Sequence, residues 1–160
     1  MKITSEAEML ALGQKVAAKL KLPAVIELVG DVGAGKTTFT RGLAQGLGIS
    51  EAVTSPSFTI SKRYTFTANP KCCKNDNTSG KTPSSGELIH YDFYRLNDPG
   101  IMRDELAETL QEPNSVVVVE WGGDVAALLP EKHLRFNIAL NTDGSRDVTV
   151  NPPEFLEHLS

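Results

Sequence analysis

The spacing of apolar residues changes several times along the first part of the chain. Ser5 and Glu8 form a capping-box pattern, after which apolar residues return every three or four positions. This spacing predicts a helix that is stopped by Pro23. A short apolar run predicts a buried strand over residues 24–29, and the helical spacing returns over residues 37–47. The expected order is helix, strand, loop and helix.

In the middle of the chain the apolar period becomes two. This alternation predicts half-buried strands over residues 58–66 and 87–94, which we expect to pair as an antiparallel hairpin. The connecting residues 67–86 are rich in Lys, Asn, Ser, Thr, Gly and Pro, and they predict a long, mobile and solvated hairpin insertion. Further along, residues 101–110 have a helical pattern, and residues 116–120 predict a strand at the centre of a sheet.

The last part of the chain predicts a second hairpin. Alternating residues over 134–140 and 146–150 flank a turn at 141–144, and a short helix is expected over residues 153–159. A length of 160 residues suits one domain with its own core. We therefore expect a single α/β domain over residues 1–160, with a mixed parallel and antiparallel central sheet flanked by helices.

Composition narrows the classes of function. The chain has 16 Lys and Arg against 20 Asp and Glu, and a net charge of -4 does not favour binding of nucleic acid through bulk charge. Its two cysteines, Cys72 and Cys73, are adjacent and cannot link distant segments. No apolar run is long enough for a membrane span, and the first residues have no apolar signal region. We therefore expect a cytoplasmic protein without membrane association.

A glycine-rich loop carries the clearest chemical signal. Residues 30–37 read Gly-Asp-Val-Gly-Ala-Gly-Lys-Thr, a complete G-x-x-x-x-G-K-[ST] phosphate loop between a predicted strand and a predicted helix. Its glycines let the backbone turn tightly and point N–H groups at phosphate, and the helix adds its positive end. Lys36 is expected to bridge the β- and γ-phosphates, and the Thr37 hydroxyl to bind Mg²⁺. The predicted nucleotide-binding residues of this P-loop NTPase are Asp31, Val32, Gly33, Ala34, Gly35, Lys36, Thr37 and Thr38.

Two carboxylates at strand ends are candidates for the chemistry beside this loop. Glu120 ends an apolar strand, and Asp92 ends a more polar one. Either could ligate Mg²⁺, directly or through water, or orient an attacking water. We therefore predict Lys36, Asp92 and Glu120 as the catalytic residues. His90 has the pattern of a packed strand histidine more than that of a base, and Trp121 fits either sheet-end packing or a partner contact.

The segment after the second predicted helix is a candidate switch. Thr54, Ser55, Pro56 and Ser57 combine hydroxyls with a rigid proline where a GTPase would place a γ-phosphate sensor. The same residues also fit a plain loop that leads into a strand.

Together these residues resemble one family. The blocks are Gly-Asp-Val-Gly-Ala-Gly-Lys-Thr-Thr-Phe-Thr-Arg-Gly (30–42), Thr-Ser-Pro-Ser-Phe-Thr (54–59), His-Tyr-Asp-Phe-Tyr-Arg-Leu (90–96) and Val-Glu-Trp (119–121). In this order they are similar to the TsaE (YjeE) family, small bacterial P-loop ATPases of tRNA threonylcarbamoyladenosine biosynthesis. The likeness covers most of the chain. It is weakest over residues 97–105, which align poorly with the family, and residues 67–86 are longer than its usual hairpin.

The resemblance implies a specific biochemistry. The family binds ATP with Mg²⁺, hydrolyses it slowly alone, and associates with the TsaD–TsaB heterodimer of the threonylcarbamoyltransferase subunit and its inactive paralogue. ATP turnover there supports repeated modification of the adenosine next to the anticodon, with tRNA contacted indirectly. By this resemblance, Thr37 and Glu120 bind the metal and Asp92 lies at the catalytic centre. The block from Thr54 to Ser57 is a switch, and Glu6 and Arg146 lie near the nucleotide.

Three other functions stay open on the residues alone. A small-molecule kinase would use arginines such as Arg95 and Arg103 in a lid, but no distinct lid segment is present. A GTP-binding module would carry the guanine-reading Asn-Lys-x-Asp motif, which the sequence lacks. A nucleotide-dependent binding protein without useful hydrolysis would have the same motifs as a slow ATPase.

Overall fold

The computed structural model describes residues 1–56, 59–67, 85–94 and 100–157. Its strands form one seven-stranded sheet in the order β1-β7-β6-β2-β5-β4-β3. The elements are β1 (Lys2–Ile3), α1 (Glu6–Ala17), β2 (Ala24–Val29), α2 (Lys36–Leu47), β3 (Ser61–Phe66), β4 (Gly86–Asp92), α3 (Gly100–Thr109), β5 (Ser115–Glu120), the 3₁₀ helix η1 (Gly122–Leu128), β6 (Leu134–Leu140), β7 (Arg146–Asn151) and α4 (Glu154–Glu157).

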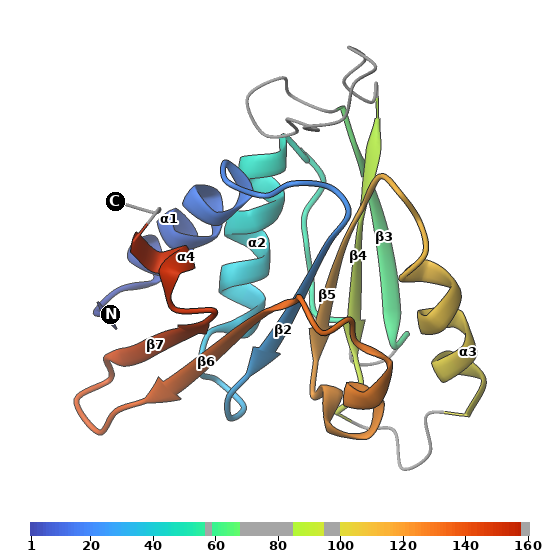
Figure 1. The fold of residues 1–160 in the computed structure, drawn as a ribbon. Helices are drawn as coiled ribbons and strands as arrows, with labels where there is room; N and C mark the ends of the chain where they lie inside the picture. Colours follow the sequence, from blue (N-terminus) through green and yellow to red (C-terminus); the bar gives the residue numbers. More distant parts are fainter. Residues whose placement is uncertain (57–58, 68–84, 95–99, 158–160) are drawn as a thin grey trace.

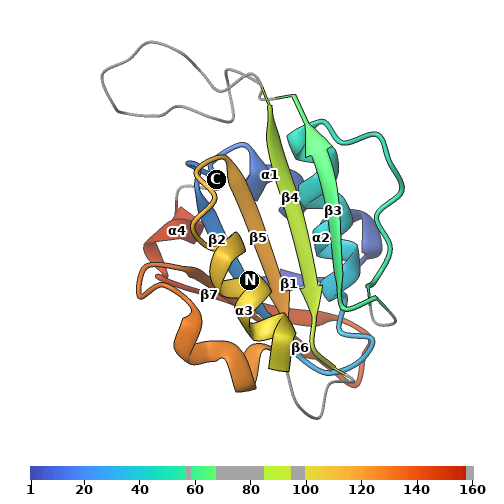
Figure 2. The same ribbon diagram turned by 90° about the vertical axis from the view of Figure 1, so that its right-hand side faces the viewer.

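The sheet is parallel at its centre and antiparallel at its edges. β2 pairs in parallel with both β5 and β6, and β4 pairs in parallel with β5. β3 pairs antiparallel with β4, β7 with β6 and β1 with β7. Helices α1 and α2 cover one face of the sheet and α3 the other (Figures 1 and 2). This arrangement confirms the predicted mixed α/β sheet flanked by helices, including its antiparallel pairing of β3 with β4.

Alternation along the central strands divides the core into two layers. Val116 and Val118 of β5 pack toward the layer that contains Phe39 of α2, while Val117 and Val119 pack toward the layer of α3. All six residues of β5 are buried, which explains the uninterrupted apolar run of that strand. Because Leu88, His90 and Asp92 alternate with Ile89 and Tyr91 along β4, His90 and Asp92 share the face covered by α2.

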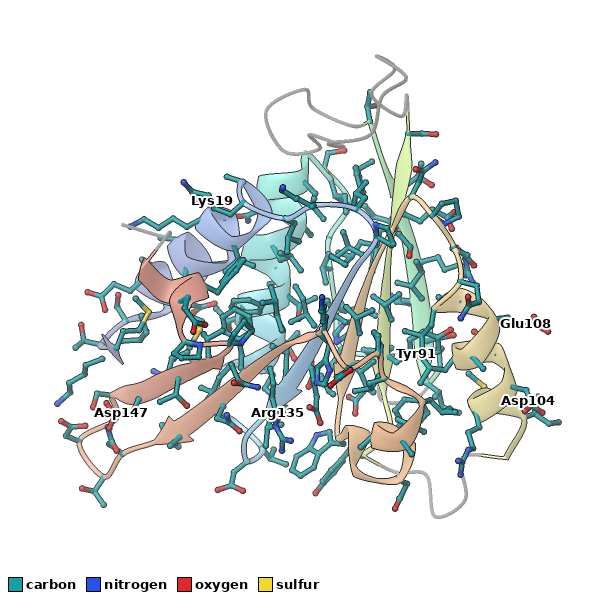
Figure 3. All side chains as sticks on the ribbon, in the orientation of Figure 1. Lys19, Tyr91, Asp104, Glu108, Arg135 and Asp147 are labelled. Carbon is teal, nitrogen blue, oxygen red and sulfur yellow. The ribbon has the colours of Figure 1, made fainter. Side chains whose placement is uncertain are left out.

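A buried tyrosine of β4 links the sheet to α3 by hydrogen bonds. The Tyr91 hydroxyl donates to Glu105 Oε1 at 3.1 Å and lies 2.8 Å from the Thr109 hydroxyl. Burial raises the pKa of the Tyr91 phenol to about 12. Figure 3 shows Tyr91 between the sheet and α3, whereas Asp104 and Glu108 project from the opposite side of that helix.

Two glycines let α1 and α2 pack backbone against backbone. A Cβ added at Gly13 would contact the Phe39 carbonyl oxygen, and one added at Gly42 would contact the Leu10 carbonyl oxygen, both too closely to be accommodated. No side chain therefore fits between the helices at this crossing. The close approach fixes where α2, and with it the phosphate loop, lies against the rest of the molecule.

Several element boundaries differ from the predicted ones. β3 begins at Ser61 because Ile60, at φ 68°, leaves the extended conformation. Helix α1 ends at Ala17, although Leu20 remains buried beyond it. β1 and η1 were not predicted, because their residues have no clear apolar period. Most of the predicted insertion, residues 68–84, lies outside the described residues, so that assignment stays a prediction. In the described part of the chain, no helix is both long and apolar enough to cross a bilayer.

Removal of the α1 cap is expected to weaken the fold measurably. The Glu8 N–H donates to Ser5 Oγ at 3.2 Å, and the Thr4 N–H donates back to Glu8 Oε2 at 2.6 Å, which lowers the pKa of the Glu8 carboxyl. Ser5→Ala should lower the free energy of unfolding by about 1 kcal/mol, measured by urea denaturation. Ser5→Asp is the matched control, because its carboxylate can accept the same bond and should retain wild-type stability.

Candidate nucleotide-binding site

The glycine-rich loop joins β2 to α2, as the motif predicts. Gly33 and Gly35 have φ angles of 81° and 108°, a region that disfavours side chains with a Cβ. The Ala34 N–H donates to the Asp31 carbonyl at 3.1 Å and closes the turn, and α2 begins directly after Gly35. The first N–H groups of α2 have no carbonyl partner within the helix. They are available to an anion at this end of α2.

A cavity of about 340 Å³ lies where this loop meets the ends of β4 and β5. Figure 1 shows these strand ends at the lower end of the sheet. The cavity is lined by residues of the loop, of α2, of two neighbouring strand ends, of the segment before β3 and of the start of β7. Its lining residues are Val32, Gly33, Gly35, Lys36, Thr37, Thr38, Ser55, Asp92, Tyr94, Glu120, Trp121 and Arg146. The structure thus brings together residues that were predicted from separate parts of the sequence.

Lys36 is a buried cation at the centre of this arrangement. Its side chain is 5% exposed, and Nζ donates to the carbonyl oxygens of Gly30 at 2.7 Å and Asp31 at 3.0 Å. Nζ also lies 4.5 Å from the Trp121 ring centroid and 4.0 Å from Glu120 Oε2. Burial lowers the pKa of the Lys36 ammonium, opposed by the nearby carboxylates. Such a desolvated cation interacts strongly with phosphate, because little water screens it.

The two predicted carboxylates lie side by side. Asp92 and Glu120 are opposite one another in the parallel register of β4 and β5, and both are almost fully buried. Asp92 accepts hydrogen bonds from the Ser55 hydroxyl at 2.9 Å and the Tyr94 N–H at 3.1 Å. Glu120 Oε1 lies 2.8 Å from His90 Nε2. Each carboxylate is therefore held in one orientation by specific partners.

The oxygen atoms around the cavity suit a magnesium ion that is shared with a nucleotide. The Thr37 hydroxyl and the carboxylates of Asp92 and Glu120 all border the cavity, and Mg²⁺ prefers such hard oxygen ligands. Among the described residues, no group of three or more His, Cys, Asp or Glu could hold a metal by itself. Mg²⁺ usually takes one or two protein oxygens and completes its shell with phosphate and water, so the donor set fits.

Three other predicted site residues, Asp31, Ala34 and Glu6, are not among the residues that line the cavity. Asp31 borders a neighbouring cavity of about 380 Å³. Ala34 is fully buried, and its carbonyl accepts a hydrogen bond from Arg146 Nε at 3.2 Å. Glu6 does not border the nucleotide cavity; its side chain is 66% exposed and pairs with Arg41 at 3.5 Å. Its assignment to the nucleotide stays a prediction.

The candidate switch reaches the cavity through one residue. Ser55 borders the cavity and contacts Asp92, whereas the Thr54 hydroxyl accepts a hydrogen bond from Lys62 Nζ at 2.8 Å. Pro56 is buried, and Ser57 lies outside the described residues. A conformational change over this segment would therefore act on the site through Asp92.

Sequence reasoning missed the contact between His90 and Glu120. The available signal was the spacing of two between His90 and Asp92, which puts both side chains on one face of β4. The contact also required the pairing of β4 with β5, which the sequence did not reveal.

Comparisons with known proteins agree with this geometry. The sequence pattern of the family described as "Threonylcarbamoyl adenosine biosynthesis protein TsaE" matches residues 3–148. Relatives named tRNA threonylcarbamoyladenosine biosynthesis protein TsaE are 37% identical in both Streptomyces coelicolor and Bacillus subtilis. The alignments cover 87% of this chain in each case, and 86% and 76% of the relatives. The crystal structure of Bacillus subtilis YdiB superposes with a TM-score of 0.68 at 31% identity, covering 99% of this chain and 91% of that one. The chain therefore belongs to the TsaE family of threonylcarbamoyl adenosine biosynthesis proteins.

Proposed function

We propose that this protein is a Mg²⁺-dependent ATPase required for N6-threonylcarbamoylation of the tRNA adenosine next to the anticodon. The observation that carries the proposal is the convergence of Lys36, Thr37, Asp92 and Glu120 on one cavity at the N-terminus of α2. A phosphate loop with a buried cation and buried carboxylates supplies the parts that phosphoryl transfer to water needs.

Each residue has a distinct task in this mechanism. The backbone N–H groups of residues 33–37 and the Lys36 ammonium offset the negative charge that spreads over the transferred phosphoryl group. Thr37 and Glu120 would hold Mg²⁺, which would supply charge neutralisation for the phosphates of the nucleotide. Asp92, which accepts hydrogen bonds from Ser55 and the Tyr94 N–H, would orient the attacking water. Arg146 would contact the nucleotide from β7.

The proposed partner is the TsaD–TsaB heterodimer of the threonylcarbamoyltransferase subunit and its paralogue, in the cytoplasm. Tyr94 borders the cavity and is 50% exposed, and Val32 of the loop is 65% exposed. Exposed apolar side chains at the mouth of a site are suited to protein contact. A partner that covers this mouth would exclude water and complete the site, so slow hydrolysis by the isolated chain is expected. Contact with tRNA would then be indirect.

Hydrolysis of ATP by the purified protein, with and without the heterodimer, tests the proposal. Stimulation by the heterodimer that Lys36→Ala abolishes is the expected result. Normal nucleotide binding without stimulation would contradict it and favour a small-molecule kinase or a binding-only switch, which a screen of phosphoryl acceptors would separate. Lys19→Ala is the matched control, since this lysine is exposed and lies near the end of α1 away from the cavity (Figure 3).

A further inference from the structure

His90 is a buried polar side chain with one partner. It lies on β4, its exposed fraction is 0%, and Nε2 is 2.8 Å from Glu120 Oε1. Nδ1 is buried without a hydrogen-bond partner, and it is the one such side-chain nitrogen or oxygen among the described residues. Core packing alone does not explain this residue, because an apolar side chain would fill the position without burying an unbonded nitrogen.

The contact assigns the tautomer of the ring. A carboxylate only accepts hydrogen bonds, so the hydrogen that joins the two groups is carried by His90 Nε2. The opposite tautomer would set the Nε2 lone pair against the carboxylate and leave an N–H buried at Nδ1 with no acceptor. His90 is therefore a donor to Glu120 in this fold, and the unbonded nitrogen is the lone-pair side of the ring.

The two carboxylate oxygens of Glu120 have different neighbours. Oε1 is held by His90 from the core side, and Oε2 lies 4.0 Å from the ammonium of Lys36. Among the described residues, His90 is the one side chain that hydrogen-bonds Oε1. Without His90, the carboxylate would be drawn toward Lys36 as a direct ion pair, because opposite charges in a desolvated site attract strongly. That rearrangement would displace the Glu120 carboxylate from the position proposed to hold Mg²⁺, while Lys36 stays held by the carbonyl oxygens of Gly30 and Asp31.

We infer that His90 is a positioning residue that donates from Nε2 to Glu120 Oε1 and so keeps the other carboxylate oxygen directed at the nucleotide cavity. The inference rests on the proposed role of Glu120 in Mg²⁺-dependent ATP hydrolysis. His90 transfers no proton and does not contact the substrate in this role. It acts only by fixing the orientation of the Glu120 carboxylate.

A matched pair of substitutions tests the inference. The side-chain amide of Gln reaches from Cβ about as far as Nε2 of histidine, whereas the amide of Asn reaches only as far as Nδ1. We expect His90→Asn to lower turnover by about tenfold to hundredfold with KM for ATP changed less than threefold. His90→Gln should restore turnover to within about threefold of wild type. Equal loss in both variants, or no loss in His90→Asn, would overturn the inference.

Two readouts do not depend on turnover. Trp121, the sole tryptophan, is next to Glu120, so its fluorescence can report Mg²⁺ binding to the ADP complex. Mg²⁺ affinity should fall about tenfold in His90→Asn and recover in His90→Gln. In ¹⁵N NMR of the wild-type chain, His90 should show the Nε2–H tautomer, and Glu120→Gln should shift that signal. An Nδ1–H tautomer would overturn the inference.

Failure of this inference differs from failure of the proposed function. If wild-type turnover is not abolished by Lys36→Ala, the proposed ATPase function fails whatever His90 does. If wild type is active and Lys36-dependent while His90→Asn behaves like wild type, only the role of His90 fails. Thermal unfolding of both His90 variants within a few degrees of wild type shows that each retains the fold.

Discussion

Lys36→Ala is expected to weaken ATP binding by about tenfold to hundredfold, which is the range of a lost charge-assisted hydrogen bond of roughly 1.5–3 kcal/mol. The ammonium is almost fully buried and is held in place by two carbonyl oxygens of its own loop. It would therefore meet phosphate already oriented and desolvated. Its loss should remove an interaction that forms with bound ATP and strengthens in the transition state, so affinity falls together with turnover.

Glu120→Ala is expected to lower turnover strongly and to leave ATP affinity nearly unchanged. The carboxylate is 4.0 Å from Lys36 Nζ and is held by His90, so we expect it to act beside the phosphates without supplying the cation that binds them. We expect ATP affinity within about threefold of wild type and turnover lower by about a hundredfold or more. Glu120→Gln keeps the size and one acceptor oxygen, and it should lose turnover with less effect on stability.

Calorimetric titration with ATP and single-turnover hydrolysis separate the two roles. Lys19→Ala serves as the control for removal of a lysine, because the wild-type Lys19 side chain is exposed. Equal loss of ATP affinity in Lys36→Ala and Glu120→Ala would contradict the division of roles. It would mean that the carboxylate contributes to binding through the metal as strongly as the ammonium does.

The sequence predicted the site better than it predicted the contacts within it. The phosphate loop at residues 30–37 could be predicted from neighbouring residues alone, because glycine φ angles and a helix N-terminus depend only on adjacent residues. Glu120 ends an apolar strand and Asp92 ends a more polar one, so their place at the end of a sheet could also be predicted. That these two carboxylates lie opposite one another depends on the parallel register of β4 and β5, which no local pattern specifies.

The absence of β1 from the prediction and the early predicted start of β3 share a physical cause. β1 has only residues Lys2–Ile3, and it exists because it pairs with β7 and not because of its own pattern. The start of β3 was predicted too early, since the apolar alternation includes Ile60 while its backbone at φ 68° turns the chain. Local pattern reports which face a residue prefers, and tertiary pairing decides where a strand begins.

Gly42→Ala is expected to destabilise the fold by about 2 kcal/mol or more, even though alanine is the better helix former. In an exposed helix the change would gain about 1 kcal/mol. In α2 the new Cβ would press on the Leu10 backbone, with the carbonyl carbon and Cα only 2.8 Å away. A backbone cannot rotate aside as a side chain can, so α1 and α2 must separate. Overpacking of this kind costs roughly 1–3 kcal/mol and sometimes more.

Thermal unfolding should therefore show a midpoint lower by about 4–8 °C. Gly123→Ala is the matched control, because a Cβ there would meet nothing within 4 Å and should leave the midpoint almost unchanged. A Gly42→Ala midpoint equal to wild type would mean that the helices repack without cost. The same substitution should also weaken ATP binding. Helix α2 carries Lys36 and Thr37 in its first turn, so separation of the helices would move that turn relative to Asp92 and Glu120. We therefore expect nucleotide affinity to depend on a glycine that lies outside the cavity, through the rigid body of the helix.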